Sequence, residues 1–451
     1  MNIIIVGCGK VGQTLVEQLT TNENNVTIVD INEQRAKEIR KRYDVMDVVG
    51  NGATLVTLEE AGLRNADLLI AVTGSDELNL LCCIIAKKAR NIQTIARVRR
   101  PEYRKDIRYL REELGIAMII NPEYEAAVEI ERVLRFPSAT KIDTFAKDKI
   151  ELIKFKITDK CTLKDYAVKE IATKLHCDVL VPMIERNNDI IIPNGEQKFL
   201  NGDVVSIIAS PSETQSFFKK INLYSQQTKN VIIIGGGEIA IYLAQLLAKR
   251  GIKVKIIEKD ETRCDELFTL LPDATIVHGD ASDRETLLEE GVSNVDGVVA
   301  LTNIDEENIL LSLYVKNKSK AKVVTKVNRI DFDEVVNKLD LDSIVNPKFI
   351  TAEMIVRFVR AMRNTTGSNV ERLYSLVKDK VEAAEFIIKT KSAIVGLPLQ
   401  KIHFKKNVLI AGILRGDKMI IPRGNDTIEI GDSVVVVSRV IGLHDITDLL
   451  G

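Results

Sequence analysis

Residues 1–30 read MNIIIVGCGKVGQTLVEQLTTNENNVTIVD and carry a strong signal for the fold class. A short apolar run enters the glycine-rich turn GCGKVG at 7–12, an amphipathic stretch follows, and a second apolar run ends at Asp30. A strand, a turn with three spaced glycines, a helix and an acid about 20 residues further along form the pattern of a dinucleotide-binding β-α-β unit. The stretch therefore predicts a parallel sheet with a nucleotide bound at the turn.

The glycines and the acid each have a physical task in such a site. Gly7 permits the tight turn, Gly9 lets the backbone approach a pyrophosphate, and Gly12 allows the helix to pack closely against the strand. The free N–H groups at the start of the helix would bind the phosphates. Asp30 would accept hydrogen bonds from the ribose hydroxyls, and an acid at this position favours NAD(H) over NADP(H).

Composition and charge are typical of a soluble globular protein with several domains. The chain has 451 residues, of which 45% are hydrophobic and 28% are charged, so two or more domains can each build a core. The net charge is −1 and there is no basic block, which argues against a nucleic-acid partner.

The sequence also predicts a cytoplasmic protein. The apolar start is too short for a cleavable signal, and no run of about eighteen apolar residues predicts a membrane-spanning helix. Any role at a membrane would therefore act through a partner. The six cysteines show no CxxC spacing, which argues against a zinc site or a disulfide framework. They are Cys8, Cys82, Cys83, Cys161, Cys177 and Cys264.

The opening pattern returns near residue 230. The turn GGGEIA (235–240) lies 228 positions after GCGKVG, and Glu258 lies 228 positions after Asp30. Further segments match in the same order: VVGNGAT with IVHGDAS, and IIIPNGEQKFLNGDVV with MIIPRGNDTIEIGDSVV. A long match with almost no gaps indicates a tandem duplication, so the chain holds two copies of one structural unit.

Each repeat divides into a larger and a smaller part. In the larger part, six apolar strand runs alternate with helix-length segments, which predicts an α/β domain with a Rossmann-like, doubly wound parallel sheet in the order 3-2-1-4-5-6. The smaller part is strand-rich and predicts a compact α+β subdomain of about four strands. Short polar segments at 136–140 and 222–228 are predicted linkers. The expected domains are 1–136 and 229–362 (Rossmann-like), and 145–220 and 372–451 (small α+β).

Further ligand contacts are expected where the other strands of the first Rossmann-like sheet end. Asn51 is placed to hydrogen-bond an adenine or a ribose. Thr73, followed by Gly74, would contact the ligand near the nicotinamide-side phosphate or ribose. Arg97 would pair with a phosphate, a charge-assisted contact stronger than a neutral one.

The second repeat keeps the glycine turn but changes its charge. Glu258 replaces Asp30 and can still bind a ribose, but Glu238 replaces Lys10 and puts an acid beside the phosphates. This pocket should hold a polyphosphate less well unless Lys326 or another cation compensates. Two interpretations stay open: a second nucleotide site, with contacts from Gly235, Gly236, Gly237, Glu238, Ile239 and Glu258, or a degenerate copy with a structural role.

Nothing beside either turn predicts catalysis. The four histidines are scattered, and none has the spacing of a catalytic triad or a zinc site: His176, His278, His403 and His444. A chain that binds a dinucleotide without chemistry beside it is better interpreted as a ligand sensor than as an enzyme. The alternatives are an NAD-dependent oxidoreductase, which would turn over NADH, and a redox-sensing DNA-binding regulator, which the neutral charge disfavours.

The duplicated motifs closely resemble the regulator-of-potassium-conductance family in its tandem form. GCGKVG with Asp30, VVGNGAT, LLIAVTGSDELNLL and the Ile-Pro…Gly-Asp strand unit each have a counterpart in the second repeat, and the resemblance covers essentially the whole chain. It implies a subunit that binds NAD(H) and, in the same class of pockets, ATP or ADP. It also implies a homo-oligomeric gating ring on the inner face of the cell membrane, which controls a membrane potassium-translocating subunit.

The resemblance assigns a nucleotide-contact role to residues that match the family motif. In the first repeat these are Gly7, Cys8, Gly9, Lys10, Val11, Asp30, Thr73, Gly74 and Arg97. In the second repeat the role extends to 235–239 and Glu258, although Glu238 and Ala240 depart from the first repeat. The small subdomains resemble the C-terminal subdomain of the family.

Overall fold

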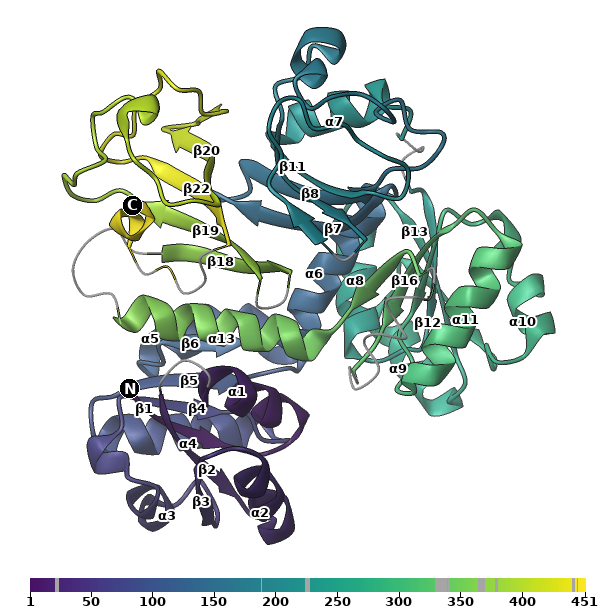
Figure 1. Cartoon of the computed structure of the whole chain (residues 1–451). Coiled ribbons are helices and arrows are strands. Elements are labelled where there is room, and N and C mark those ends of the chain that lie inside the picture. The colour runs from purple at the N-terminus through teal and green to yellow at the C-terminus, as the bar shows by residue number, and fades with distance from the viewer. Residues whose placement is uncertain are drawn as a thin grey trace. The chain divides into compact units, whose positions relative to one another are not determined.

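The computed structural model describes residues 1–20, 24–187, 189–223, 228–328, 339, 341–363, 370–377, 380–439, 443 and 445–451 (Figure 1). The predicted linker at 222–228 lies partly outside these residues. The chain forms two compact units, and each unit draws on both repeats. The first unit is Met1–Glu131 with Lys229–Val356, and the second is Arg132–Thr228 with Arg357–Gly451.

In the first unit, the first repeat forms a six-stranded parallel sheet in the order β3-β2-β1-β4-β5-β6. The predicted Rossmann-like order is therefore confirmed. The strands are β1 (Asn2–Val6), β2 (Asn25–Asp30), β3 (Met46–Val49), β4 (Leu68–Ala71), β5 (Gln93–Arg97) and β6 (Met118–Ile120). The helices are α1 (Lys10–Thr20), α2 (Glu33–Arg42), α3 (Leu55–Glu60), α4 (Asp76–Ala89), α5 (Ile107–Glu113) and α6 (Pro122–Arg135).

The second repeat builds the same sheet, in the order β14-β13-β12-β15-β16-β17, and all its pairings are parallel. Its strands are β12 (Asn230–Ile234), β13 (Lys253–Glu258), β14 (Ala274–His278), β15 (Gly297–Ala300), β16 (Lys322–Lys326) and β17 (Ser343–Val345). Its helices are α8 (Glu238–Ala248), α9 (Glu261–Leu270), α10 (Arg284–Glu289), α11 (Asp305–Lys318) and α13 (Pro347–Arg363).

Apolar runs and polar caps explain these elements. The strand β4, for example, is buried along its whole length, as expected for a parallel strand covered on both faces. Polar side chains then begin the helices that follow the strands: Asn32 accepts from the N–H of Arg35 at 2.9 Å, and Ser75 accepts from the N–H of Leu78 at 3.2 Å. Strand ends and helix starts therefore collect at one edge of each sheet, where ligands bind in this type of fold.

In the second unit, the two small subdomains each contain a five-stranded antiparallel sheet, which confirms the α+β class. The first sheet has the order β10-β9-β11-β8-β7 and the second β18-β19-β22-β20-β21. The strands are β7 (Ala139–Phe145), β8 (Ile150–Lys156), β9 (Leu180–Arg186), β10 (Asp189–Ile191), β11 (Val204–Ala209), β18 (Val370–Val377), β19 (Val381–Ile387), β20 (Val408–Arg415), β21 (Lys418–Ile420) and β22 (Ser433–Ser438). The helix α7 covers Pro211–Lys220.

Each small sheet has one strand more than expected. β7 begins at Ala139, so the prediction of a linker over all of 136–140 is wrong. The prolyl and seryl residues at 137–138 suggested a loop, but the chain becomes extended directly after them and pairs with β8. Ile142 and Phe145 of β7 are buried, so the strand contributes to the core.

The two small subdomains share a hydrophobic core within their unit. Phe145, Ile150 and Leu152 of the first repeat cluster with Val381 and Val435 of the second. Hydrogen bonds also join the two sheets: Ala146 N–H donates to Glu385 Oε2 at 3.0 Å, and the Tyr374 hydroxyl donates to the Thr144 carbonyl at 3.0 Å. Among the helices that the structure describes, none combines the length and apolarity needed to cross a bilayer.

Candidate functional site

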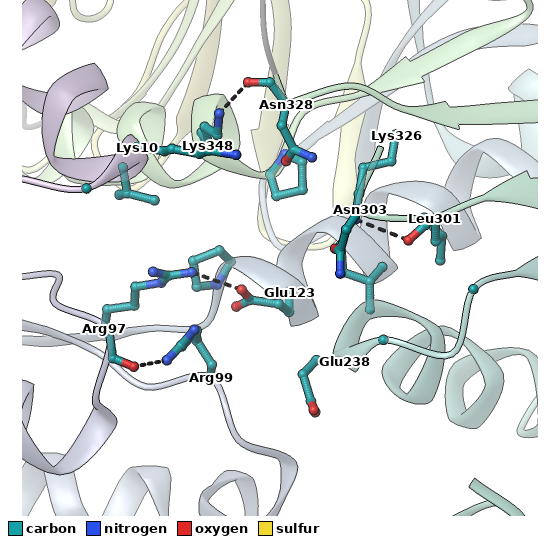
Figure 2. Close-up of a pocket in the computed structure, with 18 of the residues that line it drawn as sticks. Lys10, Arg97, Arg99, Glu123, Glu238, Leu301, Asn303, Lys326, Asn328 and Lys348 are labelled. Carbon is teal, nitrogen blue, oxygen red and sulfur yellow. Dashed lines mark hydrogen bonds and ion pairs between the residues drawn. The ribbon is translucent and has the colours of Figure 1, made fainter. Parts of the chain in front are cut away.

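Both glycine turns open into one cavity in the first unit. The cavity has a volume of about 1050 Å³, and residues of both Rossmann-like repeats line it. Figure 2 shows Lys10, Arg97 and Arg99 of the first repeat on one side, with Glu238 and Lys326 of the second on the other. All predicted contact residues line this cavity except Cys8 and Gly12. A volume of this size accommodates large nucleotide ligands.

The glycines of the first turn have the geometry that the motif predicts. Gly7 has a φ of +100°, and a Cβ there would lie 2.8 Å from the Thr73 nitrogen. A Cβ on Gly12 would lie 2.0 Å from the Gly7 carbonyl oxygen, so α1 packs against the turn only with glycine at this position. A Cβ on Gly9 would meet no atom within 4 Å, because this residue faces the cavity. Neighbouring protein atoms therefore require glycine at Gly7 and Gly12, whereas the missing side chain at Gly9 leaves space for a ligand.

Asp30 holds the first turn in place. The side chain is buried, and its Oδ2 accepts from the Cys8 N–H at 2.7 Å while Oδ1 accepts from the Asn32 N–H at 2.8 Å. Arg35 Nη1 lies 3.5 Å from Oδ2. Oδ1 has one such hydrogen bond and keeps a further lone pair, so binding to a ribose and support of the turn are compatible.

The Cys8 thiol is buried behind this turn. Burial, with a smaller contribution from the Asp30 charge, raises the pKa of the thiol to about 12. Because the thiolate is the reactive form, the thiol is inert at neutral pH. This property disfavours Cys8 as a redox sensor.

An asparagine that the sequence reasoning missed organises the next two strand ends. Asn79 is fully buried in α4, and its Oδ1 accepts from the Thr73 N–H at 2.8 Å and from the Thr73 hydroxyl at 2.7 Å. Its Nδ2 donates to the Arg97 carbonyl at 2.9 Å. Asn308 makes the corresponding bonds to Thr302 and Lys326 in the second repeat. The repetition of this asparagine in the two aligned motifs was the signal that could have revealed it.

Arg97 lines the cavity but is paired with a carboxylate. Its Nη2 lies 2.9 Å from Glu123 Oε1, and both side chains are largely buried. Burial lowers the pKa of Arg97, and the Glu123 charge opposes this shift. A phosphate at Arg97 would therefore compete with Glu123 or add a second anion beside the guanidinium.

Asn51 and Lys10 also line the cavity, as expected. Asn51 Oδ1 accepts from the Ala53 N–H at 3.0 Å, so the side chain closes its own turn in addition to facing the cavity. The Lys10 ammonium has no hydrogen-bond or ion-pair partner within the described parts of the chain and is exposed. It is therefore available to an anion in the cavity.

The second turn repeats the arrangement around an acid. Glu258 Oε2 accepts from the Gly236 N–H at 2.6 Å, and Oε1 accepts from the N–H groups of Lys259 and Asp260 at 2.9 and 3.0 Å. A Cβ on Gly237 would meet no atom within 4 Å, as at Gly9. The second turn is thus built to the same plan, with open space in front of it.

Arg263 compensates the charge of Glu238. Its Nη2 lies 3.3 Å from Glu238 Oε1, and its Nε donates to the Gly236 carbonyl at 2.8 Å. Lys326, the cation considered from the sequence, is instead buried: its Nζ donates to the Leu301 carbonyl at 3.1 Å, and burial lowers its pKa. The compensating cation comes from α9 and was not predicted.

The structure brings further cations to the cavity. Arg35, Arg99, Arg263 and Lys348 line it, and Lys348 Nζ donates to the Asn328 carbonyl at 2.5 Å. Of the three histidines in the described ranges, none lines the cavity, and His444 lies outside those ranges. The cavity is therefore rich in anion-binding groups.

Comparisons with known proteins agree with this organisation. A TrkA-N domain model matches residues 3–122 and 231–347, and a TrkA-C domain model matches residues 152–222 and 383–451. The GsuK channel bound to NAD has a similar structure, with a TM-score of 0.65 over 98% of this chain and 77% of that chain. Its sequence identity is 15%, so this likeness concerns the fold.

Curated relatives match over almost their whole length. The Trk system potassium uptake protein TrkA homolog 1 of Methanosarcina mazei is 32% identical over 97% of both chains. The homolog of Archaeoglobus fulgidus is 33% identical over 97% of both chains. TrkA of Haemophilus influenzae is 31% identical over 97% of this chain and 95% of its own. With both domain models matched twice and in order, the chain belongs to the TrkA family.

Proposed function

We propose that this chain is a nucleotide-sensing regulatory subunit that controls a membrane potassium transporter. The observation that carries the proposal is the single cavity onto which both glycine turns open, lined by cations and by none of the described histidines. Cations beside two glycine turns, with none of the described histidines among them, favour ligand binding over turnover. We therefore assign the chain a regulatory role and no catalytic one.

In this proposal, NAD(H) binds at the first turn. Its pyrophosphate lies against Gly9 and the N-terminus of α1, Lys10 supplies a positive charge, and Asp30 accepts from the ribose. Thr73, Gly74 and Asn51 contact the remainder of the ligand. The second turn binds an adenine nucleotide such as ADP or ATP, because Glu258 and the open space at Gly237 preserve the ribose and phosphate positions.

The names of the relatives support the partner that we propose. Proteins named as potassium uptake proteins of the Trk system match this chain from end to end. We propose a TrkH- or TrkG-like membrane subunit as the partner, with this chain bound at its cytoplasmic face as a homo-oligomeric ring. The net charge of −1 disfavours a nucleic-acid partner.

Two matched variants test the ligand site. A valine at Gly9 or at Gly237 places its side chain in the cavity without meeting protein atoms within 4 Å of the Cβ. We expect Gly9→Val to weaken NADH binding by about tenfold or more in calorimetry, and Gly237→Val to leave it near the parent value. Unchanged NADH affinity in Gly9→Val would refute the first site.

A further inference from the structure

Tyr242 of the second repeat reaches a backbone carbonyl of the first. The side chain is fully buried in α8, and its ring packs edge-on against Tyr124, with 5.5 Å between the ring centroids. The hydroxyl donates to the Arg99 carbonyl at 2.7 Å and accepts from Asn121 Nδ2 at 2.8 Å. The same Nδ2 donates to the Arg99 carbonyl at 3.0 Å. One carbonyl of the first repeat is therefore held by a hydroxyl of the second.

Arg99, whose carbonyl accepts from Tyr242, also contacts a loop that lines the cavity. Its N–H donates to Asp76 Oδ2 at 2.8 Å, its Nε lies 3.3 Å from Asp76 Oδ1, and its Nη2 donates to the Gly74 carbonyl. Gly74 lines the cavity, and the buried Asp76 begins α4. Arg99 thus fixes the loop 73–76, to which we assign contacts with the first nucleotide.

The other end of the connection is the second glycine turn. Glu238 is the first residue of α8, and Tyr242 follows one helical turn later on the same face. A phosphate bound at Gly237 would use the N–H groups in the first turn of α8. Any shift or ordering of the first turn of α8 therefore also displaces or orders Tyr242. Because the buried Tyr242 side chain makes two hydrogen bonds through its hydroxyl, it cannot move independently of Arg99 and Asn121 without leaving polar groups unpaired.

The reciprocal contact is absent from the described residues. Thr14 occupies the position of Tyr242 in the first repeat, and its hydroxyl donates to the Lys10 carbonyl of its own helix at 3.1 Å. Asn346 occupies the position of Asn121, and within the described ranges its buried Nδ2 has no hydrogen-bond partner. The contact thus runs from α8 of the second repeat to the first repeat, and the described residues hold no equivalent contact from the first repeat to the second. It is therefore not a packing feature shared by both repeats.

We propose that Tyr242 is a positioning residue that couples the two nucleotide sites, so that a nucleotide at the second turn orders the loop 73–76 of the first. This inference rests on the proposed function, because it requires nucleotide binding at the second turn. By thermodynamic linkage, a ligand held by the loop 73–76 changes the affinity of the second turn by the same factor.

Hydrogen exchange in a chain with only the second site open tests the coupling. In the Gly9→Val background, ADP is added and exchange is measured over residues 73–76, while calorimetry follows ADP binding to the same sample. We expect ADP to slow exchange there by about fivefold or more. With Tyr242→Phe added, which keeps the ring and removes the hydroxyl, ADP should still bind but the slowing should disappear. Arg100→Ala is the matched control, because this neighbouring side chain pairs with Glu77 and Glu102 at the surface.

The outcomes separate this inference from the proposed function. If ADP binds and Tyr242→Phe keeps the full response, or if ADP binds to Gly9→Val and leaves exchange at 73–76 unchanged, the coupling role is overturned and nucleotide binding stands. Loss of ADP binding through Tyr242→Phe would make Tyr242 part of the second site and would also overturn the coupling. If ADP fails to bind to Gly9→Val, the second site is wrong, and the coupling is overturned with it.

Discussion

The carboxylate of Asp30 accepts a 2.7 Å hydrogen bond from the backbone N–H of Cys8. The acid assigned to the ribose is therefore also the group that fixes the glycine turn. Glu258 and Gly236 repeat the relationship at 2.6 Å in the second repeat. In each repeat, one acidic side chain is assigned to the ribose and also holds the glycine turn in place. A change at either acid should therefore affect both ligand binding and stability.

Asp30→Ala should weaken NADH binding by about 1–3 kcal/mol, because ribose hydroxyls would lose their acceptor. It should also lower the free energy of unfolding by a similar amount, since the N–H groups of Cys8 and Asn32 would lose a buried partner. Calorimetry and urea unfolding measure the two effects. Glu258→Ala is the control, and it should lower stability while leaving NADH affinity at the first site nearly unchanged. Equal NADH affinity in Asp30→Ala and in the parent would contradict the assignment of Asp30 to the ribose.

Glu238→Gln should strengthen ADP binding in the Gly9→Val background. The change removes a negative charge beside the phosphates and frees Arg263 from its 3.3 Å ion pair. Because both side chains are partly exposed, solvent screens the effect, and we expect a gain of only about two- to fivefold. Glu261→Gln, which changes the same charge at the start of α9, should have a smaller effect. Weaker ADP binding in Glu238→Gln would contradict this interpretation of the pair.

The Cys8 thiol should resist alkylation in the folded protein. Its pKa is raised from 9.0 to about 12, so the thiolate is scarce at pH 8. A raised thiol pKa stabilises the folded state fully below about pH 9, and this stabilisation is lost as the pH rises towards 12. Mass spectrometry after iodoacetamide treatment should find Cys8 unlabelled at pH 8 and labelled once urea unfolds the chain. Rapid labelling of the native protein would instead support a redox sensor.

Asp203→Ala should lower the free energy of unfolding of the small-subdomain unit by about 2–3 kcal/mol. The buried Asp203 carboxylate accepts from Arg186 Nε and Nη2 at 2.8 and 2.7 Å, and also from the Leu200 N–H. Asp159→Ala, which removes an exposed partner of Lys164, is the control and should leave the urea midpoint unchanged. Equal midpoints for both variants would show that the buried pair contributes little.

Much of the first unit could be predicted because its signals are local. The turn at Gly7 and the acid at Asp30 are fixed by spacing within one β-α-β unit, and the strand order follows from the same alternation. The matched domain models agree with the family inferred from these motifs. The exact domain boundaries and the ligand contacts stay predictions.

The remainder depends on how distant segments pack. Along the sequence each Rossmann-like part is followed by its own small subdomain, but the structure groups the two large parts in one unit and the two small parts in the other. The position of Tyr242 beside Arg99 follows from this grouping and has no signal in either repeat alone. Arg263 was missed for a related reason, because its pairing with Glu238 joins two helices that the pattern treats separately.

Potassium flux measured with and without NADH tests the proposed regulatory role of the chain. Rubidium uptake is measured in vesicles that contain the potassium-translocating membrane partner with the parent chain or with Gly9→Val, each with and without NADH. Under the proposed function, NADH changes the flux with the parent chain and leaves it unchanged with Gly9→Val, while both chains stay bound to the partner. The same response to NADH with both chains, or no response with the parent, would contradict it.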